Sequence, residues 1–99
     1  MRMMCFAIPS SDENRLKQII RKIESMEAYY HISPLGKVVF KVLASDNKRI
    51  PLSENEARLK TFQVEDENGL REYLKTAGYS RICDLQLGTV QGGNSSTSM

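Results

Sequence analysis

The sequence has little of the chemistry that metal centres and nucleophilic enzymes need. Its 99 residues include only two cysteines and one histidine. Cys5 and Cys83 do not have the spacing of a metal site, and a nucleophile without a nearby base is a weak catalyst. His31 stands alone as a candidate proton-transfer residue, whereas perturbed catalytic groups usually occur in clusters. We therefore expect a non-enzymatic protein without a catalytic residue, a metal or a cofactor.

Long apolar segments are also missing. No stretch approaches the roughly 20 apolar residues that a membrane-spanning helix needs, and charged residues interrupt every candidate. The apolar run at the N-terminus is short and is cut by Pro9, unlike the run of a signal peptide. We expect a reduced, cytoplasmic protein that does not contact a membrane.

The net charge of the chain excludes few classes of function. The chain has 14 Lys and Arg residues against 12 Asp and Glu residues, which leaves a formal charge of +2. A balance this small does not by itself indicate a surface for nucleic acid or for a membrane.

What remains is the composition of one globular domain. Apolar residues make up 40% of the chain and charged residues 26%, as in ordinary folded proteins. The last segment, 91–99, has no charge and is rich in Gly and Ser. We predict a single α+β domain over residues 1–90 and a disordered tail over residues 91–99.

The N-terminal part predicts a strand followed by a helix. Residues 3–8 form a short apolar run that ends at Pro9. Ser10 and Glu13 have the spacing of a capping box, so we expect the helix to begin there. Its apolar face repeats every three or four residues and consists of Leu16, Ile19, Ile20, Ile23 and Met26.

The next part has a period of two and predicts a hairpin. Residues 29–33 and 37–44 are rich in aromatic and β-branched types, and Pro34 and Gly36 lie between them. In the second arm one side is fully apolar, with Val38, Phe40 and Val42. We expect this side to pack on the first helix, against Leu16, Ile19, Ile20 and Ile23 and together with Phe6.

The C-terminal part is less regular. Residues 46–65 form an insertion in which a second capping box favours a short helix from Ser53 to Phe62, although residues 59–64 also suit a strand. The apolar residues Leu70, Tyr73, Leu74 and Ala77 predict another helix, which Gly78 would end. Residues 81–87 alternate and predict a last strand, with Cys83 on its core side and Asp84 and Gln86 on the other.

This order of elements favours a ferredoxin-like fold, βαββαβ, with an antiparallel sheet and two helices on one face. The insertion would lie between the third strand and the second helix. The alternative is a winged helix, in which residues 33–44 form a helix and residues 53–62 the recognition helix. Val38 to Val42 contains too many β-branched and aromatic residues to favour that alternative.

In the ferredoxin-like arrangement one sheet face stays open. Its side chains would be apolar at the centre, including Ala7, and polar at the margin, as in a contact surface. Cys5 would lie on this face and Cys83 on the other, so we do not expect a redox pair. The candidate interaction surface consists of Met3, Cys5, Tyr29, His31, Lys37, Val39, Lys41 and Leu43.

The function that fits this surface is a small binding or regulatory domain. Its partner would be a protein, a peptide or a second copy of the chain. The alternative is a nucleic-acid-binding domain, either a winged helix or an RNA-binding sheet. RNA-recognition domains stack bases on aromatic residues of the central strands, but residues 36–42 lack their aromatic-Gly-aromatic pattern. A wider basic field around Lys37 and Lys41 would favour nucleic acid.

Overall fold

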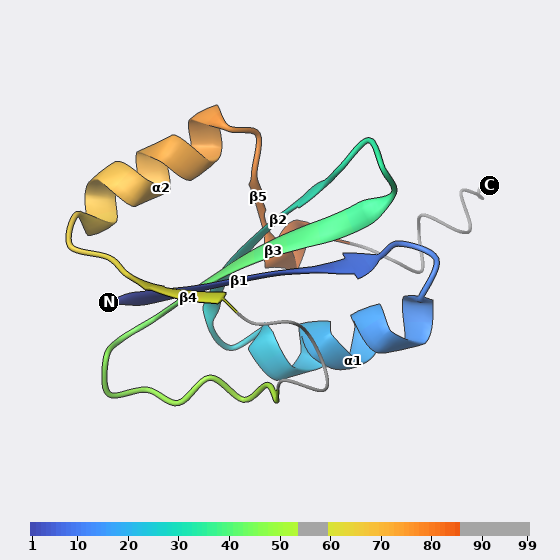
Figure 1. Ribbon diagram of the computed structural model, residues 1–99, viewed down its shortest axis with the longest axis horizontal. Coiled ribbons are helices and arrows are strands. Elements are labelled where there is room, and N and C mark those ends of the chain that lie inside the picture. The colour runs from blue at the N-terminus through green and yellow to red at the C-terminus, as the bar shows by residue number, and fades with distance from the viewer. Residues whose placement is uncertain (54–59, 86–99) are drawn as a thin grey trace.

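The computed structural model describes residues 1–53 and 60–85 (Figure 1). These residues form a five-stranded antiparallel sheet with one long helix on each side. The α+β class with two helices is therefore confirmed. In chain order the elements are β1 (Arg2–Pro9), α1 (Glu13–Ile23), β2 (Glu27–Ile32), β3 (Lys37–Ala44), β4 (Lys60–Gln63), α2 (Glu67–Thr76), β5 (Ser80–Arg81) and the short 3-10 helix η1 (Ile82–Asp84).

The N-cap of helix α1 lies two residues after the expected one. Asp12, not Ser10, is the N-cap, and its carboxylate accepts from the backbone N–H of Arg15 at 3.4 Å. The Ser10 hydroxyl instead donates to the carbonyl oxygen of Gly36 at 2.9 Å, as does the Ser10 backbone N–H at 2.8 Å. The predicted capping box is therefore wrong, because Ser10 connects the end of β1 to the β2–β3 hairpin.

The hairpin turn has the geometry that its sequence predicts. The Gly36 N–H donates to the Ser33 carbonyl at 3.0 Å, and Pro34 occupies the position where a fixed φ is favourable. Gly36 itself has a φ of +79°, which closes a three-residue hairpin loop with little strain. Residues 37–44 are a strand, so the winged-helix alternative is excluded.

The sheet order is β4-β1-β3-β2-β5. At its centre β1 and β3 pair along their whole lengths, with Phe6 opposite Phe40. This order differs from the ferredoxin-like prediction, which has four strands with the fourth after the second helix. Here β4 comes before α2 in the chain, and a fifth strand, β5, follows α2. Residues 60–63 of the insertion are a strand at the sheet edge, where a helix was expected. Residues 54–59 of that helix lie outside the described part.

The main core lies between α1 and one sheet face. Leu16, Ile19 and Ile23 are buried against β1 and β3, and Ile20 packs at the edge of this core. The rings of Phe6 and Phe40 stack with centroids 5.0 Å apart. The predicted contact between the first helix and the strands is confirmed.

Helix α2 covers the other face of the sheet, which corrects the prediction that both helices share one face (Figure 1). Leu74 is fully buried there against Tyr29 and Leu43, with Leu70 and Met3 beside them. Tyr73 and Ala77, expected in the apolar stripe, are exposed. Gly78 ends the helix region with a φ of +89°, as predicted.

The chain after α2 departs from the predicted long strand. Only Ser80 and Arg81 pair with β2, and η1 then turns the chain so that Ile82 is buried in the main core. Cys83 is exposed, so its expected place on the core side is wrong. Gln86 and the predicted tail, 91–99, lie outside the described residues. No helix in the described part is long and apolar enough to cross a membrane.

The core predicts unequal costs for two neighbouring isoleucines. Ile19→Ala should lower the free energy of unfolding by about 2–5 kcal/mol, because it removes a fully buried side chain and leaves a cavity. Ile20→Ala should cost clearly less, because Ile20 is only partly buried. Urea titrations of both variants measure the difference, and equal midpoints would contradict this packing.

Candidate functional site

The sheet face beneath α2 carries most of the charged side chains of the strands. Strand register places fourteen side chains on it, since alternate residues share a face. We call this the α2 face; it consists of Met3, Cys5, Ala7, Pro9, Glu27, Tyr29, His31, Lys37, Val39, Lys41, Leu43, Lys60, Phe62 and Arg81. Four of these are cations, and Glu27 is the single carboxylate.

All eight residues of the predicted surface lie on the α2 face, but they are not equally accessible. Helix α2 buries Tyr29 and Leu43 and packs beside Met3, so these three do not belong to an open surface. The other five, Cys5, His31, Lys37, Val39 and Lys41, are partly buried or exposed. They lie toward the end of the sheet that the β2–β3 hairpin forms.

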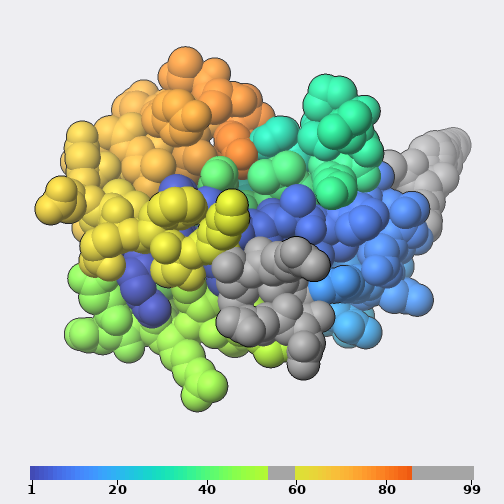
Figure 2. All heavy atoms as spheres, viewed as in Figure 1, coloured from blue at the N-terminus to red at the C-terminus, as the bar shows by residue number. Residues whose placement is uncertain are grey.

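We call the part that α2 leaves uncovered the open half of the face. In Figure 2, atoms of β1 and β3 are visible in a hollow between α2 and the hairpin. At its centre the Lys41 ammonium donates to the Cys5 sulfur at 3.1 Å, across the β1–β3 pair. Ala7 and Val39 are the next opposed pair, so apolar side chains lie beside the Lys41 ammonium at the centre of the open half.

The His31 ring closes one side of this half. Tyr79, from the segment after α2, packs against it edge-to-face with ring centroids 4.5 Å apart. Burial raises the pKa of the Tyr79 hydroxyl above its ordinary value. The sequence carries no signal for this role of Tyr79, because the role depends on α2 lying above this face.

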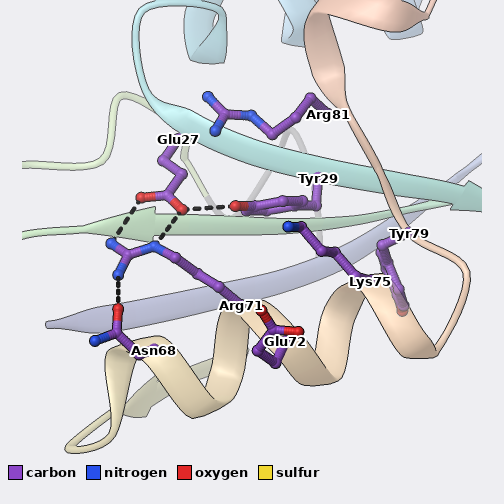
Figure 3. Close-up of a pocket in the computed structure, with 8 residues that line it drawn as sticks. All are labelled: Glu27, Tyr29, Asn68, Arg71, Glu72, Lys75, Tyr79 and Arg81. Atoms are coloured by element: carbon purple, nitrogen blue, oxygen red, sulfur yellow. Dashed lines mark hydrogen bonds and ion pairs between the residues drawn. The ribbon is translucent and has the colours of Figure 1, made fainter.

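Beside α2 the α2 face is hollowed into a groove of about 630 Å³. One wall is α2, and the other consists of the start of β2 and of β5 (Figure 3). The side chains that line it are mostly charged or aromatic: Glu27, Tyr29, Asn68, Arg71, Glu72, Lys75, Tyr79 and Arg81.

An ion pair at one end of the groove attaches α2 to the sheet. Arg71 donates to both carboxylate oxygens of Glu27, from Nε at 2.8 Å and from Nη2 at 3.0 Å. The Tyr29 hydroxyl donates to the same carboxylate at 2.7 Å. The hydrogen bond from Arg71 is the main cause that lowers the pKa of Glu27. Burial, together with the bond to Glu27, raises the pKa of Tyr29.

The groove also holds two cations that form no ion pair within the described residues. The Arg81 guanidinium lies over the Tyr29 ring, 5.2 Å from its centroid. Lys75 extends from α2 toward the same ring (Figure 3). Sequence reasoning missed Arg71, Lys75 and Arg81. The only signal was the spacing of Arg71 and Lys75, one helical turn apart.

The described residues offer no set for metal binding. Within residues 1–53 and 60–85, no three His, Cys, Asp or Glu side chains lie close enough together to hold a metal ion. Asp84, predicted at the margin of the open face, is exposed in η1. Comparison of the chain with protein-family models, with curated proteins and with solved structures finds no match.

The Glu27–Arg71 pair predicts a pH-dependent contribution to stability. At neutral pH, Arg71→Met should lower the free energy of unfolding modestly, since it breaks two charge-assisted hydrogen bonds of a partly exposed pair. Because the pKa of Glu27 is lowered in the folded state, the contribution is complete above the unfolded pKa and is lost as pH falls through the folded pKa.

Urea unfolding at neutral and at strongly acidic pH measures this loss. The difference between wild type and Arg71→Met should shrink at acidic pH, where Glu27 is protonated in both proteins. Lys75→Met is the matched control, because Lys75 lies one turn away on α2 without an ion pair in the described part. A difference that stays constant with pH would show that Arg71 acts through packing alone.

Proposed function

We propose that this protein is a non-enzymatic binding domain that recognises an acidic protein or peptide on the open half of the α2 face. The observation that carries the proposal is the charge of this face. Its strands present Lys37, Lys41, Lys60 and Arg81, whereas the one carboxylate is already occupied by Arg71. The face therefore attracts negative charge more strongly than the net charge of the chain suggests.

The arrangement of side chains on the open half favours an extended segment. Cys5, Ala7 and Val39 form an apolar patch beside Lys41, and Lys37 and Lys60 are exposed on either side of it. A chain in which acidic and apolar residues alternate would place apolar side chains on the centre and carboxylates beside the lysines. Such a domain would act by binding a segment of its partner and blocking that segment from other contacts, which fits a regulatory role.

Nucleic acid is the second candidate, and one observation favours it. Lys37 and Lys41 belong to a basic field that also includes Lys60 and Arg81, and such a field attracts phosphates. Against it, the residues that the central strands β1 and β3 place on the open half, Cys5, Ala7, Val39 and Lys41, include no aromatic side chain for base stacking. An acidic peptide does not need such a ring.

We also propose a cytoplasmic location. Cys5 and Cys83 are both free thiols, and Cys83 is exposed. Unpaired thiols favour a reducing environment such as the cytoplasm.

Charge reversal on the open half tests the proposed function. A short labelled peptide with alternating Glu and Val should bind the wild type, and Lys37→Glu combined with Lys60→Glu should weaken binding about ten-fold or more. Fluorescence anisotropy measures both affinities. The matched control is Lys17→Glu, an exposed lysine of α1 on the far side of the sheet, which should leave binding unchanged.

The same titration distinguishes the alternatives. A labelled single-stranded RNA that binds more tightly than the peptide, and that loses affinity in the double variant, would replace the acidic partner with nucleic acid. Light scattering on the wild type tests for a second subunit. A dimer that dissociates in the double variant would identify the partner as another copy of the chain. Binding of neither probe by a monomeric protein would contradict the proposal.

A further inference from the structure

The groove beside α2 has its own charge pattern, which shares Arg81, but not Lys37, Lys41 or Lys60, with the basic side chains of the strands. Three cations and two carboxylates line it. Arg71 and Glu27 neutralise each other through two hydrogen bonds, and the Tyr29 hydroxyl donates a third hydrogen bond to the same carboxylate. Lys75 and Arg81 are left without an ion pair among the described residues. Glu72 stays against helix α2, whereas Lys75 reaches into the groove (Figure 3).

The two remaining cations come from opposite walls. Lys75 belongs to α2 and Arg81 to β5, and both lie beside the ring of Tyr29 (Figure 3). That ring is fixed, because its hydroxyl is held by Glu27 at 2.7 Å and Arg81 lies over its face. A guanidinium that stacks on a ring still directs its N–H groups outward in the guanidinium plane. An oxyanion between Lys75 and Arg81 would thus meet a guanidinium that already lies against the Tyr29 ring and an ammonium group that reaches it from the opposite wall.

The groove also offers an aromatic surface. Tyr79 lines it, and His31 holds the Tyr79 ring edge-to-face at 4.5 Å. The volume of about 630 Å³ lies within the range of small-molecule sites. A planar ring stacked near Tyr79 and an oxyanion near Lys75 and Arg81 would together occupy the two kinds of surface that the groove presents.

We propose that this groove binds a small aromatic phosphate monoester, with the phosphate held by Lys75 and Arg81 and the ring placed against Tyr79. A phosphate monoester carries a charge of about −1.5 to −2 at neutral pH, which complements these two cations better than a single carboxylate does. The proposal goes beyond the binding of an acidic partner and does not rest on it, because the open half depends on Lys37 and Lys60.

Titration of the full chain with adenosine 5′-monophosphate tests the site by NMR. Amide shifts should concentrate in residues 27–30 and 68–81. Adenosine, which lacks the phosphate, and inorganic phosphate, which lacks the ring, should each bind about ten-fold more weakly or worse if both surfaces contribute. Lys75→Gln and Arg81→Gln should each weaken nucleotide binding to a similar degree. Lys75 is exposed, so Lys75→Gln should keep the wild-type urea midpoint. Arg81→Gln also removes the contact with the Tyr29 ring, so a lower midpoint in that variant alone would leave Lys75→Gln as the test of the site.

Lys37→Gln is the matched control, because Lys37 lies on the same face but outside the groove, and it should leave nucleotide binding unchanged. Equal affinity for benzoate and for the nucleotide would overturn the phosphate assignment. Shifts that centre on Lys37 and Lys60 would overturn the site, since they would show that the nucleotide binds the basic open half. No saturable shift with any of these compounds would overturn the proposal as a whole, whatever the acidic peptide does.

Discussion

The pairing of β1 with β3 is the constraint on which the rest of this structure depends. Their register places Phe6 against Phe40 on one face and Cys5 against Lys41 on the other. A shift of one residue would exchange the two faces of β3 and bring Lys37 and Lys41 into the core. The buried apolar face beneath α1 therefore fixes which charges the opposite face must present.

That opposite face is divided, and the division follows from its composition. Tyr29 and Leu43 lie at one end, where Leu74 of α2 covers them. The other end holds lysines, which lose hydration if a helix covers them. Glu27, opposite Leu43, also lies at the covered end, where Arg71 of α2 pairs with its carboxylate. Helix α2 thus covers the end of the face that carries Tyr29 and Leu43, and the exposed cations beyond it become available for a ligand.

Sequence periodicity was sufficient for the parts that form strong patterns. The face of α1, the hairpin and the inward side of Val38, Phe40 and Val42 follow from spacing alone, because each buries a continuous apolar set. Periodicity does not determine which face of the sheet α2 packs on, since an apolar stripe that contains Leu70 and Leu74 could pack on either face. The groove was missed for the same reason: Arg71 and Arg81 line one site only after α2 is placed above β2.

Helix α2 is held less firmly than α1, and this difference sets a hierarchy of local opening. In the described part, the cluster beneath α2 has Tyr29, Leu43 and Leu74 as its buried members, whereas α1 packs on the extended main core. Regions with little buried apolar contact open without global unfolding. Amide hydrogens of α2 should therefore exchange with solvent through a partial opening that leaves α1 and β3 protected, so the α2 face is periodically uncovered while the core stays folded.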